Sequence, residues 1–136
     1  MRASAVLISA CAMIAAPTLA LADPTGTYNV VGRNADDGST YKGTAQVSRT
    51  GTTYKVVWLI AGKQSTGTGL GTHLENDGKT IVTGPASDRD IGLSVGYLNK
   101  DSYGIATYYR QSDGSWSGVW AYGGSQNVTV ETWTPQ

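Results

Sequence analysis

From residue 27 onward, apolar and polar residues alternate along the chain with a period of two. Residues 41–48 show it clearly, because Tyr, Gly, Ala and Val alternate there with Lys, Thr, Gln and Ser. The alternation recurs over 54–60, 91–97 and 116–122, and Val128 and Val130 begin it once more. Since alternate side chains of a strand face opposite sides of a sheet, this period predicts β-structure rather than helix. The predicted strands are 27–33, 40–49, 53–61, 65–73, 79–83, 91–97, 103–110, 115–122 and 127–133.

Residues typical of tight turns separate these strands. Asp37-Gly38, Asn76-Asp77-Gly78 and Asp113-Gly114 are examples, and glycine there supplies the positive φ that many hairpins need. For Asp113-Gly114 we expect a type I′ hairpin, with a positive φ at Gly114. Residues 84–90 form the one longer loop.

This pattern predicts an all-β domain, and a small antiparallel up-and-down barrel of eight or nine strands is the first choice. Closure into a barrel removes exposed sheet edges, and glycines within the strands permit tight curvature or close approach of large rings. A β-sandwich is the alternative. An outer-membrane barrel is disfavoured, because the face opposite the aromatic residues is often Lys, Thr, Gln or Ser.

The first 22 residues differ in composition from the rest and predict a signal peptide. Arg2 precedes an Ala-rich apolar stretch, and Ala20-Leu21-Ala22 is a small-x-small cleavage site before Asp23. A membrane anchor and a lipoprotein site at Cys11 are the less favoured alternatives. We therefore divide the chain into a signal peptide, 1–22, and a single domain, 23–136, located in the periplasm or secreted. The predicted mature domain contains no cysteine.

Charge and charged residues exclude several function classes. The chain has 10 Lys+Arg and 10 Asp+Glu, with the basic residues scattered, so nothing predicts nucleic-acid binding. His73 is the only histidine and is interpreted as a surface residue, which disfavours a hydrolytic triad or zinc site. Acidic residues such as Asp37, Asp77, Asp90 and Asp113 are assigned to turns, with calcium at 88–90 or 76–77 as a weak alternative.

The Gly-rich segment 67–71 has a spacing that superficially resembles a phosphate-binding loop. A phosphate cradle needs a helix N-terminus after it, and no helical pattern follows here. We therefore interpret the segment as a strand.

The remaining candidates for function are aromatic. All 12 aromatic residues are Tyr or Trp, and those that share a face with Val, Ile and Gly are expected to point inward. Two interpretations stay open: the rings fill a small core, or they line the mouth of a barrel and stack on a ligand. The candidate ligand-binding residues are Tyr41, Tyr54, Trp58, Trp116, Trp120 and Tyr122.

Three elements of the chain resemble a group of small exported bacterial proteins. They are Gly26 to Gly32 (G-x-Y-x-V-x-G), residues 34–43 (N-x-D-G-S-x-Y-x-G with one extra residue) and Gly51 to Trp58 (G-x-x-Y-x-V-x-W). Most of residues 26–134 are similar to that group, including Trp120 and Trp133 near the end. Some members carry a fibronectin-binding label, so the resemblance implies a barrel and adhesion, without site residues. Avidin-like barrels are similar in architecture only.

These observations lead to a functional expectation. We expect an exported, non-enzymatic protein that binds a small ligand or glycan in the mouth of a barrel, with no cofactor, no metal and no nucleic-acid partner. After removal of the signal peptide, we expect no membrane span. The alternative is an envelope module that contacts an extracellular protein through its surface, as an adhesin or inhibitor. A hydrolase is the third and least favoured class.

Overall fold

The computed structural model describes residues 23–136, in which nine strands and no helix are found. The predicted signal peptide lies outside these residues. Within 23–136, no helix has the length and hydrophobicity that crossing a membrane requires. The strands are β1 (Gly26–Arg33), β2 (Thr40–Thr50), β3 (Thr53–Ile60), β4 (Lys63–Leu74), β5 (Ile81–Gly84), β6 (Gly92–Asn99), β7 (Ser102–Arg110), β8 (Trp116–Tyr122) and β9 (Thr129–Pro135).

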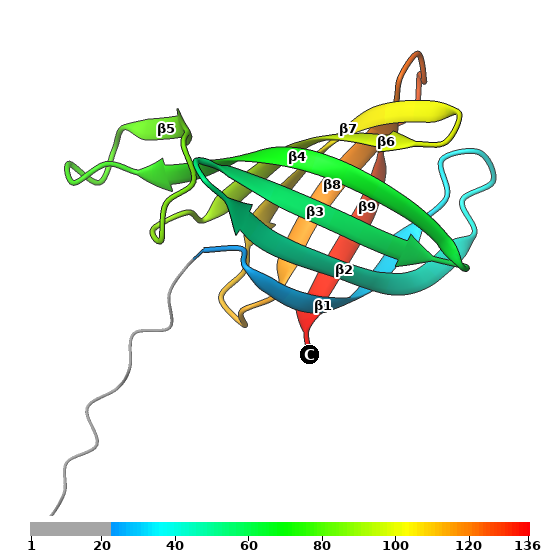
Figure 1. Ribbon diagram of the computed structural model, residues 1–136, viewed down its shortest axis with the longest axis horizontal. Coiled ribbons are helices and arrows are strands. Elements are labelled where there is room, and N and C mark those ends of the chain that lie inside the picture. Colours follow the sequence, from blue (N-terminus) through cyan, green and yellow to red (C-terminus); the bar gives the residue numbers. More distant parts are fainter. Residues whose placement is uncertain (1–22) are drawn as a thin grey trace, which may run out of the picture.

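Eight of these strands form a closed antiparallel barrel, which confirms the predicted fold class (Figure 1). The order runs β3-β2-β1-β9-β8-β7-β6-β4, and pairing of β3 with β4 closes the ring. Strand β5 is an addition: it pairs only with Gly71–Leu74 at the end of β4 and forms a hairpin that extends beyond the barrel. Closure favours the barrel over the sandwich, because every barrel strand has two partners.

Every predicted strand end lies within two residues of an observed one, but the valines that mark the alternation in the last strand do not lie on its inner face. Val128 is exposed just before β9, and Val130 is exposed on the outer wall at 53%, while Glu131 and Trp133 are buried on the inside. The reason is that β9 carries apolar residues in both alternating positions. Val130 pairs with Val119 on the outside, and Trp133 pairs with Trp116 on the inside.

Glycines in β4 make room for large side chains inside the barrel. A Cβ atom added at Gly67 would lie 2.4 Å from Val95 and 3.1 Å from Trp58, and one at Gly69 would lie 2.8 Å from Leu93. Segment 67–71 is therefore a strand, as predicted, and its glycines are sites of close approach rather than a phosphate cradle.

One end of the barrel is filled and covered. The loop after β5 crosses this end, where the Ala86 N–H donates to the Thr52 carbonyl at 2.8 Å and Arg49 donates to the Ala86 carbonyl. Buried side chains pack beneath it. This core comprises Tyr28, Val30, Ala45, Val47, Tyr54, Val56, Ala86, Leu93, Val95, Ala106, Tyr108, Trp116 and Trp133, with Trp58 and Trp120 above them.

Asp90 and His73 correct two expectations at this covered end. Asp90 is fully buried (0% exposed) and accepts hydrogen bonds from the Tyr54 hydroxyl and the Ser87 N–H, each at 2.7 Å. His73 is also buried, with Nδ1 3.0 Å from the Asp90 carboxylate. Asp90 does bond its own turn, but it also fills the space left by Gly71, so neither residue belongs to the surface.

The remaining acidic turns are as predicted, although one turn type is not. Asp37, Asp77 and Asp113 each accept backbone N–H bonds two or three residues ahead. Gly114 has the expected positive φ of 84°, but Asp113 does not share it, so the turn is a three-residue loop with a left-handed glycine. A type I′ pattern occurs instead between β3 and β4, where Ala61 (φ 50°) and Gly62 (φ 74°) are both left-handed.

We expect Gly114→Val to lower the free energy of unfolding by about 1–2 kcal/mol, because a β-branched residue is strained at positive φ. A Cβ there would meet nothing within 4 Å, so strain is the only cost. Gly96→Val is the matched control, since Gly96 is also unobstructed but has an ordinary strand φ. Equal denaturation midpoints for the two variants would contradict the assignment.

Candidate functional site

The uncovered end of the barrel contains a cavity of about 340 Å³ that opens to solvent. Its rim is formed by the connections between β1 and β2, β3 and β4, β6 and β7, and β8 and β9, which bring Asn34, Ala61, Lys63 and Asn99 to the lip. Ligand cavities are typically about 300–1,000 Å³, so this mouth is at the small end of that range. The other lining residues are Tyr41, Trp58, Ile60, Ser65, Tyr97, Tyr108, Trp120, Tyr122 and Glu131.

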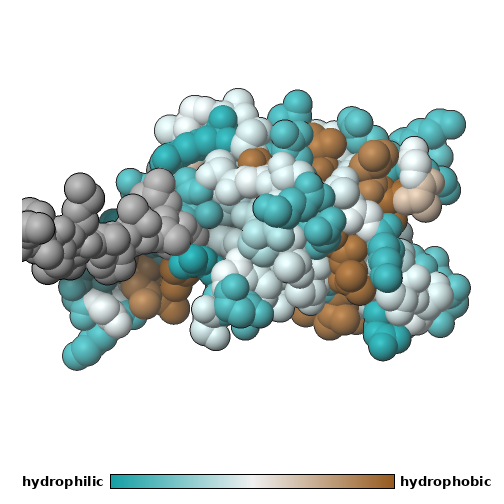
Figure 2. All heavy atoms as spheres, turned by 90° about the horizontal axis from the view of Figure 1, so that it is seen from below, coloured by the Kyte–Doolittle hydropathy of each residue, from teal (hydrophilic) through white to brown (hydrophobic). Residues whose placement is uncertain are grey.

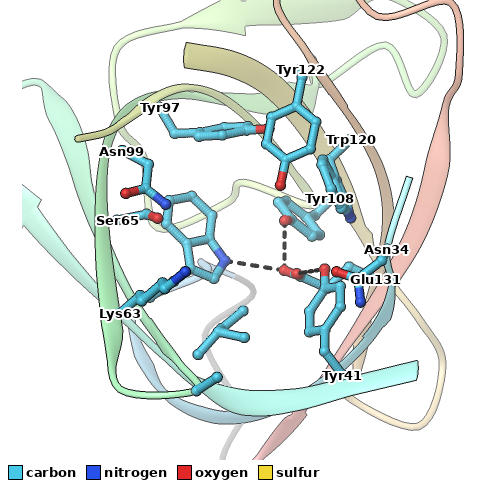
Figure 3. Close-up of a pocket in the computed structure, with 13 residues that line it drawn as sticks. Asn34, Tyr41, Lys63, Ser65, Tyr97, Asn99, Tyr108, Trp120, Tyr122 and Glu131 are labelled. Atoms are coloured by element: carbon cyan, nitrogen blue, oxygen red, sulfur yellow. Dashed lines mark hydrogen bonds between the residues drawn. The ribbon is translucent and has the colours of Figure 1, made fainter. Parts of the chain in front are cut away.

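The walls of this mouth are aromatic rings set at steep angles to one another. Tyr97 and Trp120 are seen edge-on along two adjacent sides in Figure 3, with an interplanar angle of 74° and ring centroids 6.5 Å apart. Trp58 makes a further wall at 62° to Tyr97, and Tyr122 stands across Trp120 at 82°. Because the angles are steep, the rings enclose the cavity from several directions instead of stacking on one another.

A buried carboxylate forms the floor. Glu131, on β9, is 4% exposed, and its Oε1 accepts from the indole N–H of Trp58 at 3.0 Å and the hydroxyl of Tyr108 at 2.8 Å. The Trp133 indole also donates to Oε1, and the Tyr41 hydroxyl donates to Oε2. These donors come from β2, β3, β7 and β9, so one side chain ties four strands together. Hydrogen bonds of this kind offset the cost of burying a charge.

The tyrosines around this carboxylate are held in their neutral, donating form. Burial, together with the Glu131 charge, raises the pKa of the Tyr41 hydroxyl well above its usual 10.0. Burial and the same charge raise the pKa of Tyr108. The nearby Trp120 indole lowers the pKa of Tyr41 by less than burial and Glu131 raise it, and its buried Nε1 has no hydrogen-bond partner within residues 23–136.

The structure divides the six candidate residues between the two ends of the barrel. Tyr41, Trp58, Trp120 and Tyr122 line the mouth. Tyr54 and Trp116 do not: Tyr54 bonds to Asp90 at the covered end, and Trp116 is 2% exposed in the packed core. Alternation along a strand shows which side chains face the barrel interior, but not how far along the barrel axis each one lies. Two side chains four residues apart on the same face are separated by about 13 Å, enough to place them at different ends.

Among the residues of the mouth that the sequence analysis did not select, three form its floor and wall: Glu131, Tyr97 and Tyr108. The last strand was recognised by the alternation of Val128 and Val130. Glu131 occupies the opposite phase of that alternation, where a charged residue is normally expected to face solvent. Tyr97 and Tyr108 were recognised as strand residues without being linked to the mouth. The spacing Glu131-x-Trp133 was the available signal, since a carboxylate two residues from a tryptophan on a strand shares its face.

Within residues 23–136, the two ring nitrogens of His73 lie near carboxylates. His73 Nε2 lies 3.8 Å from Glu75, and no serine or threonine hydroxyl bonds to His73 there. Ser87 contacts Asp90 through its backbone N–H rather than its hydroxyl. In the same described range, no three His, Cys, Asp or Glu side chains are grouped so that they could hold a metal ion.

Comparison of the chain with models of known protein families finds no match, and comparison with curated proteins finds none either. The class of protein is defined by its structure: a small eight-stranded antiparallel barrel with a buried aromatic cluster. The resemblance to exported, fibronectin-binding-labelled proteins stays a prediction.

Proposed function

We propose that this protein is an exported, non-enzymatic binding protein that takes a small ligand in the mouth of its barrel. The observation that carries the proposal is the open, aromatic-lined cavity above Glu131. One end of the barrel is packed with side chains, yet at the other end the rings of Tyr97, Trp120 and Tyr122 stand around a space. Export rests on the sequence of residues 1–22 alone.

The walls are also positioned before any ligand arrives, which favours binding. Trp58 and Tyr41 are fixed by their bonds to Glu131, and Tyr97 donates to the Ala121 carbonyl at 3.2 Å. A site whose side chains are already ordered loses less conformational entropy on binding.

Nuclear magnetic resonance of the four tryptophan indole N–H groups tests this proposal. Small compounds of varied charge, including cations, anions and neutral rings, are added one at a time to the purified protein. We expect at least one to shift the Trp58 and Trp120 signals, which report on the mouth, while the signal of Trp116, which neither lines the mouth nor bonds to Glu131, stays unchanged. The proposal fails if no compound moves the two mouth signals, or if all four move together.

The outer wall supports a second candidate, a surface that contacts another protein. The outward-facing residues of β6 to β9 include no Asp, Glu, Lys or Arg, and Ile105 and Leu98 are 71% and 65% exposed. On the face drawn in Figure 2, most hydrophobic residues lie toward the mouth end. Exposed apolar patches commonly mark interaction sites. An extracellular protein partner that shifts outer-wall signals without moving Trp58 or Trp120 would favour this candidate.

A further inference from the structure

The mouth combines two features that each select for the charge of a ligand. One is the set of aromatic faces, and the other is the carboxylate beneath them. This inference rests on the proposed function, because it names the class of ligand that the same cavity would take.

Glu131 is a buried negative charge without a cationic partner. Its four hydrogen-bond donors are two indoles and two hydroxyls, all neutral, and the ion pairs found within residues 23–136 involve only His73. Indole N–H groups can only donate, so the carboxylate serves as the acceptor at the floor. The cluster as a whole therefore leaves one uncompensated negative charge below an open cavity.

The rings above this charge add to its preference for a cation. The faces of Trp58, Tyr97 and Trp120 carry the negative part of the aromatic quadrupole, and they attract a cation placed over them. The attraction grows when water is displaced, as it would be within this narrow mouth.

The hydrogen bonds to Glu131 also distinguish among cations. Oε1 already accepts from Trp58, Tyr108 and Trp133, and Oε2 accepts from Tyr41, so the lone pairs of the carboxylate are largely engaged. A primary ammonium group needs acceptors for its three N–H bonds, and the engaged Glu131 carboxylate offers it few. A fully methylated ammonium needs none and presents an apolar surface to the rings.

We propose that the barrel mouth binds a quaternary ammonium group, with the rings of Trp58, Tyr97, Trp120 and Tyr122 around it and the Glu131 carboxylate below it. Among the residues that line the mouth, Lys63 at the rim is the one cation that would repel such a ligand. Because Lys63 is exposed, solvent screens this repulsion.

Choline and its neutral analogue 3,3-dimethylbutan-1-ol, in which carbon replaces nitrogen, are the matched probes. Titration is followed by tryptophan fluorescence and by the indole signals of Trp58 and Trp120. We expect choline to bind about tenfold more tightly than the neutral analogue. Ethanolamine, with a primary ammonium group, should bind more weakly than choline.

Two variants locate the source of the preference. Glu131→Gln should bring the affinities for choline and the neutral analogue close together, and Lys63→Gln should raise choline affinity about two- to threefold by removing a like charge. If Glu131→Gln does not fold, Tyr122→Leu serves instead. Tyr122 lies at the mouth, and its hydroxyl makes no hydrogen bond to any of residues 23–136. Loss of its ring should weaken the binding of choline more than that of the neutral analogue.

Equal or tighter binding of the neutral analogue by the wild-type protein would overturn the quaternary ammonium proposal while leaving a binding mouth intact. A choline preference that survives in both Glu131→Gln and Tyr122→Leu would overturn it too. If no compound of any charge moves the Trp58 and Trp120 signals, the binding function itself fails.

Discussion

Glu131→Leu is expected to lower the free energy of unfolding by about 3–5 kcal/mol, a large fraction of the stability of a domain of this size. Leucine removes the acceptor shared by four donors. Water in the cavity can replace the bonds lost by Tyr41 and Trp58, but Trp133 does not line the cavity and is 0% exposed, and Tyr108, which lines it, is only 1% exposed. Each donor left buried without a partner costs about 1–3 kcal/mol. Urea denaturation, followed by far-ultraviolet circular dichroism, measures the change.

Glu131→Gln is the matched control, because its amide oxygen still accepts from the indoles while its NH₂ group cannot accept from Tyr41. We expect a loss of about 1–2 kcal/mol for this variant. A leucine variant as stable as the wild-type protein would show that the cluster contributes little to the barrel and that its role lies elsewhere.

The barrel was predictable because its strands follow two local rules throughout. Alternation at 41–48 or 54–60 defines a strand with one buried face, and Asp-Gly or Asn-Asp-Gly sequences end it. These signals depend on neighbouring residues only, so they survive without knowledge of the fold. The orientation of β9 was not predictable in this way, since Val130 and Trp133 are both apolar and the choice between them depends on the neighbouring strands.

The site was only half predictable for a related reason. The pattern placed Trp58, Trp120, Tyr41 and Tyr122 on the inner face, and the structure confirms that orientation. It did not separate them from Tyr54 and Trp116, because depth within a barrel depends on the stagger of paired strands. Glu131 and Asp90 were missed as buried carboxylates because most of their partners are distant in the sequence. Tyr41, for example, is 90 residues from Glu131.

Trp116→Ala and Trp120→Ala test directly which part of the barrel is filled. The two tryptophans lie four residues apart on the same face of β8, so their backbone setting is closely matched. Trp116 is surrounded by the packed core at the covered end, whereas Trp120 turns one ring face to the cavity. We expect Trp116→Ala to cost about 3–5 kcal/mol of unfolding free energy and Trp120→Ala about half as much.

The smaller cost at position 120 is expected because the face of the Trp120 ring that borders the cavity has no packed neighbours to lose. Removing Trp116 leaves a void in the core that the surrounding side chains cannot close, and the lost contacts add to the lost transfer free energy. Removing Trp120 enlarges a space that is already open to water. Acrylamide provides an independent measurement, since it should quench a smaller share of the emission once Trp120 is gone and a larger share once Trp116 is gone. Equal losses of stability together with unchanged quenching in both variants would mean that the mouth is as closed as the core, and that function must be sought on the outer wall.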